Sequence, residues 1–541
     1  MKKALALALS AVMAVSVLAG CGSAAGGTNV ITINLAEEPK TIDPTLNSSV
    51  DGGTYIQHVF EGLATVDQNL QTVPGAAESW TTSDDGTVYT FKIRKDAKWS
   101  DGKDVTANDF VYSWKRAVDP ATASEYAYQL YYVKNAATIN GGESSLTLDD
   151  LGVKAIDEKT FEVTLEGPCS YFLELTTFPT LFPLREDIVA ANPETWSNDP
   201  ATYIGNGPFK MKSWNHDADL TLVKSETYWN AKNIKNNELK FVLMADDNTI
   251  YSAFKNGELL FADTLPASEI ATTTADGTLS IKAQLGTYFY VFNTEKAPFN
   301  DARVRKALTL AIDRSFIVES VTKANQIPAG AFVPTGLPDA KGGDDFRLKA
   351  GNYYDPTAAG NEANIAEAKK LLAEAGYPDG KGFPTISFGT NDTQGHIDVA
   401  QAIQQMWEKD LGIKTTIATQ EWSVFQQSRR DGAFDIARHG WLGDYVDPMT
   451  FLDMWTSTSG QNDAFFKNSD FDSLIETGRV EGDRTKRIEA LHKAEDILVG
   501  QEYAVLPIYY YSDLYLTSPT LKNVVYSPLG FKYFFWATIE K

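Results

Sequence analysis

The sequence predicts an α/β protein made of two lobes that face a cleft. Its second half alternates helix and strand patterns, which is typical of parallel strands joined by helical crossovers. After the N-terminal segment described below is removed, about 520 residues remain, too many for one compact core. No low-complexity segment follows residue 29, so the lobes must be closely connected. In such folds ligands bind at the ends of strands, and we expect a ligand there.

The individual elements follow from the spacing of apolar residues. Apolar and polar residues alternate over 87–94 and 159–165, which predicts half-buried strands, and a helix is predicted between them over 109–117. In the second half, helices are predicted from Asp301, over 365–375 (ended by Gly376) and over 398–411, and strands over 385–388 and 414–418.

The first twenty residues have the pattern of a secretory signal peptide. Lys2 and Lys3 precede a short apolar run that cannot span a membrane by itself. Cys21 directly follows Leu-Ala-Gly, a sequence that resembles a lipobox and implies a lipid on the Cys21 sulfur. Residues 21–28 would then form a lipidated tether, with plain secretion as the alternative. We expect an extracytoplasmic protein anchored to the cell membrane, with a Gram-positive-type surface favoured over a periplasm.

Charge and cysteine content exclude several classes of function. The formal charge is −23, and it becomes −25 once residues 1–20, which contain two lysines and no acids, are removed. Such a charge argues against nucleic acid as a partner. With Cys21 lipidated, only Cys169 remains, so an intramolecular disulfide is impossible. The five histidines show no metal-ligand spacing, and we expect neither a metal nor a cofactor.

No constellation of catalytic residues is evident. The sequence lacks the nucleophile elbow Gly-x-Ser-x-Gly, the zinc motif His-Glu-x-x-His and a Walker-type phosphate loop. We therefore expect a binding protein and not an enzyme. A secreted peptidase is the alternative from another class, and a time course with intact peptide would separate the two.

Residues 434–448 form the most informative segment. An extended run carries Arg438, Gly440 and Trp441, and it ends in a lone carboxylate, Asp444, followed by turn residues. A carboxylate at a strand end beside an aromatic wall suits a ligand with a positive amine. The alternative is that Asp444 merely caps the turn.

This segment and its surroundings resemble the oligopeptide-binding family, the solute-binding proteins of peptide-importing ABC transporters. The resemblance runs from about residue 31 to near the C-terminus. Its landmarks are Glu38-Pro-Lys-Thr-Ile-Asp43-Pro44, Phe60-Glu-Gly-Leu63, residues 97–102 and 105–112, Gly152 to Asp157, Lys296 to Asp301 and residues 419–422.

The resemblance implies a two-lobed, type II periplasmic-binding-protein-like fold with an extra small domain on the first lobe. The N-terminal lobe would comprise 29–61, 187–285 and 511–541, the extra domain 62–186 and the second lobe 286–510. A protein of this family captures short peptides by lobe closure and delivers them to an ABC permease that is driven by a separate ATPase. We expect a monomer. A signalling-peptide (pheromone) receptor of the same fold is the alternative.

The resemblance also assigns roles to residues. Asp444 would hold the peptide amino group, and main-chain groups at Gly440 and Leu442 would pair with the peptide as an added strand. The peptide carboxylate would meet Arg438, Arg429 and His396, and the cleft would be walled by Tyr126, Trp422 and Trp441. Four alternatives stay open: an Arg438–Asp444 ion pair, His396 as a helix cap, Gly440 as a bulge, and the aromatic residues as core.

Three positions depart from the pattern of the family. A disulfide of well-known relatives corresponds to Gly286 and Leu442, so it is absent here. A lysine used for longer peptides corresponds to Thr322, with Lys323 one residue on. An acidic residue near the amine site corresponds to Ser48, which leaves Asp444 as the expected partner of the amine.

Overall fold

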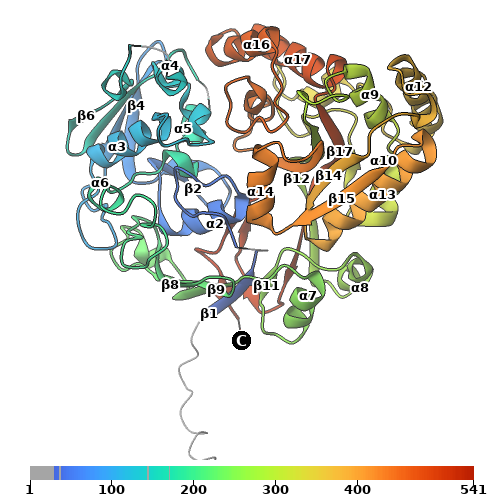
Figure 1. Ribbon diagram of the computed structural model, residues 1–541. Coiled ribbons are helices and arrows are strands. Elements are labelled where there is room, and N and C mark those ends of the chain that lie inside the picture. Colours follow the sequence, from blue (N-terminus) through green and yellow to red (C-terminus); the bar gives the residue numbers. More distant parts are fainter. Residues whose placement is uncertain (1–29, 36–37, 143–144, 170, 541) are drawn as a thin grey trace, which may run out of the picture.

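The computed structural model describes residues 30–35, 38–142, 145–169 and 171–540 (Figure 1). The expected signal peptide, Cys21 and the tether lie outside the described residues. Within the described part, no helix combines the length and the apolar character needed to cross a membrane.

The largest β-sheet of the described chain has eleven strands and extends through both halves of the molecule. Its strands are, in order, β15 (Thr415–Gln420), β14 (Ile386–Asn391), β16 (Ile436–Leu442), β12 (Leu279–Phe292), β17 (Val505–Thr517), β11 (Phe261–Ala262), β1 (Val30–Asn34), β10 (Glu238–Val242), β9 (Asp219–Lys224) and β8 (Phe209–Asn215), with β13 (Ile327–Pro328) on β17. We call the half with β1 and β8–β11 the first lobe and the half with β14–β16 the second lobe.

Two long antiparallel strands, β12 and β17, connect the lobes. One stretch of their pairing, from Leu279 to Ala283, lies next to β11, and the other, from Thr287 to Val291, lies next to β16. The register shifts between Ala283 and Thr287. The chain thus crosses between the lobes twice, in extended segments that bend near this shift. These observations do not test the residue boundaries that were expected for the lobes, so those boundaries remain predictions.

The second lobe has the predicted parallel crossovers. β14 pairs in parallel with both β15 and β16. Its core is formed by apolar side chains of the sheet and of the helices that cover it, such as Tyr290, Ile403 and Trp407. The helices of this lobe are α9 (Ala302–Leu310), α10 (Arg314–Phe316), α11 (Phe346–Ala350), α12 (Asn361–Glu374), α13 (Gln394–Leu411), α14 (Trp422–Arg430), α15 (Met449–Leu452), α16 (Ser469–Val480) and α17 (Arg484–Glu495).

A separate four-stranded sheet lies on the first lobe. Its order is β4 (Ala77–Thr82), β5 (Val88–Ile93), β7 (Thr160–Thr164) and β6 (Val153–Asp157), and α3 (Ala107–Val118) packs on it through Trp114 and Phe161. Near it lie the hairpin β2 (Ala64–Val66) and β3 (Thr72–Pro74), and the helices α4 (Ala136–Gly141), α5 (Phe172–Leu175) and α6 (Glu186–Val189). This separate sheet with its helices agrees with the expectation of an extra small domain on the first lobe.

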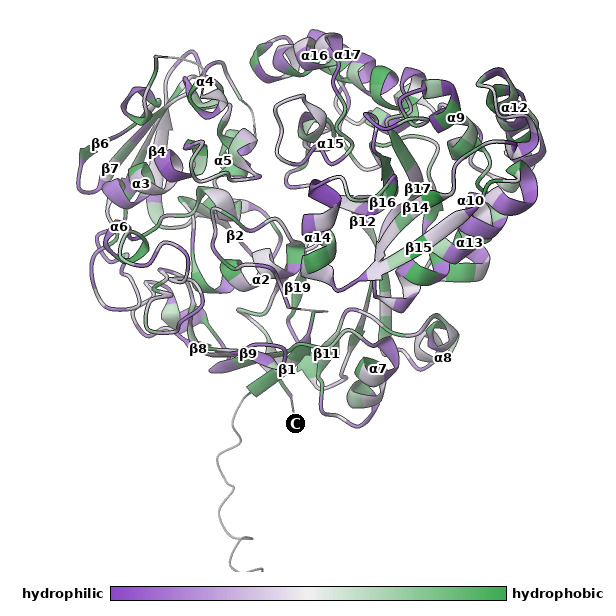
Figure 2. Ribbon diagram, in the orientation of Figure 1, coloured by the Kyte–Doolittle hydropathy of each residue, from purple (hydrophilic) through white to green (hydrophobic). Residues whose placement is uncertain are grey.

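The first lobe contains further helices and short strand pairs. They are α2 (Val50–Val59), α7 (Asp247–Lys255), α8 (Ile270–Ala275) and the short C-terminal pairs β18 (Leu521–Lys522) with β21 (Thr538–Ile539) and β19 (Val525–Tyr526) with β20 (Lys532–Tyr533). Figure 2 shows hydrophobic residues on strands such as β14 and β17, and hydrophilic residues on outer helices such as α16. The predicted strands and helices are confirmed, with α12 and α13 each beginning four residues earlier than expected.

Candidate functional site

A cavity of about 790 Å³ lies between the two lobes. The first lobe lines it with residues of α2, α7 and the segment before α8, and the second lobe lines it with residues of α13, α14 and β16. The nine residues that the sequence predicted to contact a peptide all line this cavity. They are Tyr126, His396, Trp422, Arg429, Arg438, Gly440, Trp441, Leu442 and Asp444.

Asp444 lies just beyond β16 and is held from the opposite lobe. Its carboxylate accepts a hydrogen bond from Gln129 Nε2 at 2.6 Å and a longer one from the Tyr126 hydroxyl at 3.4 Å. Both donors are neutral, and no ion pair to Asp444 is found among the described residues. The capping alternative is wrong, because the cap of the following turn is Asp447, which accepts from the Met449 backbone.

The electrostatics of Asp444 favour a cationic ligand. Burial raises the pKa of its carboxyl well above the usual value, and the nearby Asp453 raises it further. Burial likewise raises the pKa of Asp453, to about 7. The oxygen of the Gln129 amide, Oε1, is buried without a hydrogen-bond partner. A carboxylate and a free acceptor at one place suit an ammonium group, which has three donors and no acceptor.

Arg438 is the positively charged residue near the other end of the segment that contains Asp444. Its guanidinium lies 5.2 Å from the Tyr288 ring centre and 5.7 Å from that of Trp422, and it donates a long hydrogen bond to Tyr511. Its Nε is buried without a partner, and no carboxylate pairs with it in the described chain. The proposed ion pair with Asp444 is therefore wrong.

His396 lies beside Arg438. Its ring is 5.5 Å from that of Tyr288, and burial together with the Arg438 charge lowers its pKa well below the usual value. His396 is not a helix cap, because α13 begins at Gln394 with Thr393 at the N-cap. The neutral imidazole leaves Arg438 as the charged group at this end.

Arg429 forms a buried ion pair with another residue, Asp463. Its Nε lies 2.5 Å from Asp463 Oδ2, and both side chains are buried. A second guanidinium nitrogen donates to the Arg438 carbonyl at 3.3 Å. Arg429 therefore lines the cavity with its charge neutralised, and it braces the backbone of β16 below Arg438.

The strand β16 has an open edge toward the cavity. On one side it pairs with β12 without interruption, from Leu442 opposite Gly286 to Ile436 opposite Phe292. On the other side it pairs with β14 only at Ile436 and Ala437. The continuous pairing shows that Gly440 is not a bulge. From Arg438 to Leu442, no second strand neighbour is found in the described chain, so this edge can accept an added strand.

The three predicted aromatic residues lie on the cavity wall. Trp441 is stacked on Tyr126, with ring centres 6.0 Å apart, and its Nε1 donates to the Thr450 carbonyl. These two are also largely buried in the core, whereas Trp422 is partly exposed beside Arg438. The aromatic wall therefore combines core packing with contact to the cavity.

The departures from the family pattern have local explanations. Gly286 and Leu442 are direct cross-strand partners, and a Cβ on Gly286 would lie 2.3 Å from Leu442 Cδ2. Thr322 lines the cavity, but Lys323 is exposed and is not part of the lining. At Ser48 the hydroxyl accepts a hydrogen bond from Arg430, which also pairs with the buried Glu125.

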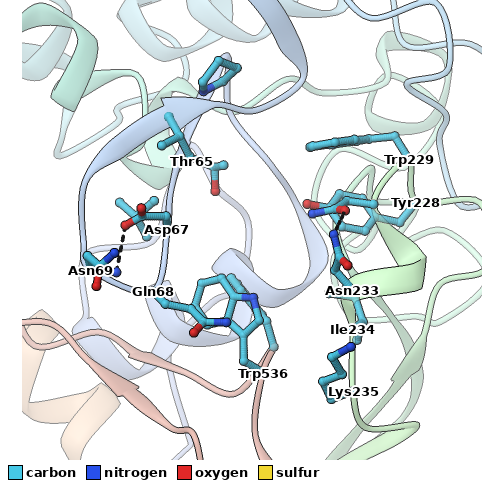
Figure 3. A pocket seen from close by; sticks show the side chains of 15 residues that line it. Thr65, Asp67, Gln68, Asn69, Tyr228, Trp229, Asn233, Ile234, Lys235 and Trp536 are labelled. Atoms are coloured by element: carbon cyan, nitrogen blue, oxygen red, sulfur yellow. Dashed lines mark hydrogen bonds between the residues drawn. The ribbon is translucent and has the colours of Figure 1, made fainter.

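A second cavity lies elsewhere on the first lobe (Figure 3). Its volume is about 470 Å³, and its walls include Trp229 and Trp536 on one side and Asp67 and Asn69 near β2 on the other. None of the predicted site residues lines it. The interlobe cavity is larger, and it is lined by charged side chains that have no ionic partner in the described chain. It is therefore the candidate site.

The sequence matches the family model described as bacterial extracellular solute-binding proteins, family 5 Middle, over residues 71–463. This match covers most of the chain. The protein belongs to this family. It is 39% identical over 537 residues to the oligopeptide-binding protein OppA of Bacillus subtilis, covering 96% of each chain.

Solved structures of relatives show the same fold. The complex of Haemophilus influenzae OppA with the peptide RPPGFSPFR superposes with a TM-score of 0.87 at 33% identity, covering 95% of this chain and 99% of that one. The unliganded open form of the murein tripeptide-binding protein MppA of Escherichia coli, at 31% identity and with 96% and 99% covered, gives 0.62. At similar identity the present structure thus resembles the peptide complex more than the open form. Direct contacts between its lobes, such as the hydrogen bond from Gln129 to Asp444, agree with a closed form.

Sequence reasoning missed several residues of the site. Gln129, Asp453, Glu125 and Arg430 were not predicted, although Glu125 and Gln129 lie in a tyrosine-rich segment next to the predicted Tyr126. A polar residue within such an aromatic run is the only signal that could have pointed to them.

Proposed function

We propose that the protein is an extracytoplasmic receptor that captures short peptides between its lobes and delivers them to an ABC importer. The observation that carries this proposal is a pair of charges left uncompensated at the two ends of an open strand edge: the Asp444 carboxylate and the Arg438 guanidinium. A peptide with free termini supplies both missing partners and the missing strand.

The peptide would run antiparallel to β16, with its ammonium at Asp444 and its carboxylate at Arg438. From Leu442 to Arg438 the strand advances by four residues, about 13 Å at about 3.3 Å per residue. Peptides of about three to five residues would span this distance. Main-chain hydrogen bonds along the edge would bind any sequence, because they do not involve side chains.

The remaining parts of the proposal rest on the sequence and on family membership. Cys21 would carry a lipid that holds the protein at the membrane, on a Gram-positive-type surface. The protein would act as a monomer, without enzymatic activity, and would dock on a permease that a separate ATPase drives. Metabolic labelling with a radiolabelled fatty acid, compared with Cys21→Ser, tests the lipid anchor; loss of label in the variant is the expected result.

The decisive experiment is calorimetric titration of ligand-stripped protein that lacks residues 1–21. Mixed-sequence tri-, tetra- and pentapeptides are compared with the same peptides acetylated at the N-terminus. Free peptides are expected to bind, and acetylation and Asp444→Ala are each expected to weaken binding by roughly a hundred-fold or more, because the partner charge stays buried and unpaired.

A matched control is Asp392→Asn, which removes an exposed carboxylate outside the cavity lining. It should bind as the unchanged protein does. If acetylated peptides bind as well as free ones, the amine anchor is not Asp444. If folded protein binds no peptide of any length, the proposed function is wrong.

A further inference from the structure

The end of the interlobe cavity beyond Arg438 contains a second pair of uncompensated acids. Asp247 belongs to α7 of the first lobe and Asp398 to α13 of the second, and both line the cavity. Asp247 accepts a hydrogen bond from the Thr264 hydroxyl and Asp398 from the Gln394 amide, both at 2.7 Å. These donors are neutral, and neither carboxylate takes part in an ion pair of the described chain.

The two carboxylates line the same cavity from opposite lobes. Burial raises the pKa of Asp247, and the charges of Asp246 and Asp398 raise it further. Two like charges on opposite lobes oppose closure unless a cation lies between them. In the closed form no described residue compensates this repulsion with an ion pair.

A buried amide at the same end points to a ligand independently of the acids. Asn391 ends β14, is 4% exposed and lines the cavity. Its Nδ2 donates to the Thr393 hydroxyl, but its Oδ1 is buried without a hydrogen-bond partner. An acceptor in this state is costly, and no described residue provides the donor that it needs.

The wider lining is acidic as well. Lys532 is shared by Asp513 at 3.5 Å and Asp263 at 3.7 Å, so two carboxylates compete for one ammonium. Arg429 is neutralised by Asp463. The acids that line the cavity are Asp51, Asp247, Asp263, Asp398, Asp444 and Asp513, against Arg429, Arg438 and Lys532. The described lining therefore has six acidic side chains against three basic ones.

We propose that Asp247, Asp398 and Asn391 form a subsite for a lysine or arginine side chain near the carboxyl end of the bound peptide. This inference rests on the proposed function. His396 and Asp398 both line the cavity from the N-terminal part of α13, so a peptide whose carboxylate meets Arg438 and His396 brings its last side chains toward this subsite. The basic group donates to Asp247 from one lobe and to Asp398 and Asn391 from the other, and so it favours closure.

The test is a scan of alanine-based tetra- and pentapeptides with free termini. Each position in turn carries lysine or norleucine, which has a comparable stem without the charge, and Kd is measured by calorimetry in buffer with EDTA. At one position near the carboxyl end, lysine is expected to bind about ten-fold tighter than norleucine, or more. The preference should decrease as NaCl is raised, because salt screens the charges.

Three variants identify the residues responsible. Asp247→Asn and Asp398→Asn keep the shape and the hydrogen-bond acceptor but remove one charge each, and each should reduce the lysine-to-norleucine ratio of affinities. Asp392→Asn removes an exposed charge beside Asn391 and should retain the full ratio. Circular dichroism of each variant confirms that it is folded.

The outcomes separate this inference from the proposed function. If norleucine peptides bind tightly and lysine gives no advantage at any position, the subsite is wrong while the receptor function stands. If lysine is preferred but neither Asp247→Asn nor Asp398→Asn changes the ratio, the subsite lies elsewhere and the inference is overturned. If no peptide binds, both proposals fail.

Discussion

Asp444 shows how one buried carboxylate can both select a ligand and sense its charge. In the ligand-free protein, desolvation and Asp453 disfavour the ionised form, and only neutral groups donate to it. A peptide ammonium reverses this balance by pairing with the carboxylate. The same group therefore couples peptide binding to loss of a proton.

This coupling predicts the pH dependence of binding. The pKa of Asp444 is raised in the ligand-free closed form, so that form loses stability as pH rises through this pKa, whereas the peptide complex needs the ionised carboxylate. Affinity should thus increase as pH rises through the raised pKa of Asp444, and fall again above about pH 8, where the peptide α-amino group deprotonates. Calorimetry in two buffers of different ionisation enthalpy measures the proton released. Asp444→Asn should release none, and equal release by both proteins would contradict the assignment.

The sequence predicted Asp444 and Arg438 because both lie in one short segment with a recognisable pattern. It could not predict Gln129, whose hydrogen bond to Asp444 joins residues 315 positions apart. Nor could the sequence show which guanidinium group, that of Arg429 or that of Arg438, lacks an ionic partner. This depends on Asp463, which pairs with Arg429 and lies in a separate loop. Pairing between distant polar residues is set by the tertiary fold and leaves no local pattern.

At the level of elements, periodicity was a reliable guide to strands and helices, but not to all of their ends. The predicted helix over 398–411 begins at Gln394, with Thr393 at the N-cap position and its carbonyl accepting from the backbone amide of Ile397, although Gly395 is a poor helix former. The long strands β12 and β17 were not predicted from periodicity, since they pass from one lobe to the other and their burial pattern changes along the way.

The open edge of β16 leads to a prediction about the peptide backbone. In an added strand, alternate amide groups face the neighbouring strand, so N-methylation of these amides removes a hydrogen bond, whereas methylation of the amides between them does not. Each methyl group on a facing amide should weaken binding by about three- to ten-fold. Titration with a series of singly N-methylated pentapeptides checks this. A uniform effect at all positions, or none, would show that the peptide does not pair with β16.

At the scale of the whole molecule, direct contacts between the lobes accompany the closed form. Arg430 of α14 pairs with Glu125 of the first lobe and donates to Ser48, and Lys40 donates to Gln427 at 3.0 Å. Tyr171 of the first lobe stacks on Tyr445 of the second, with ring centres 4.8 Å apart. A ligand shifts the equilibrium only through its greater affinity for the closed form, so these contacts and the peptide act on the same equilibrium.

Arg430→Ala tests this shared equilibrium, because Arg430 joins the lobes without lining the cavity. Its loss destabilises the closed form, and part of the binding free energy of the peptide must then be used to restore closure. We expect affinity for a tetrapeptide to fall by about three- to ten-fold, and more peptide to be needed before the radius of gyration, measured by small-angle X-ray scattering, reaches its compact value. Lys467→Ala, which breaks an exposed ion pair with Glu295 within the second lobe, is the control and should change neither quantity. If Arg430→Ala behaves like this control, the bridge to Glu125 does not contribute to closure, and the closed form is held by the peptide and the aromatic contacts.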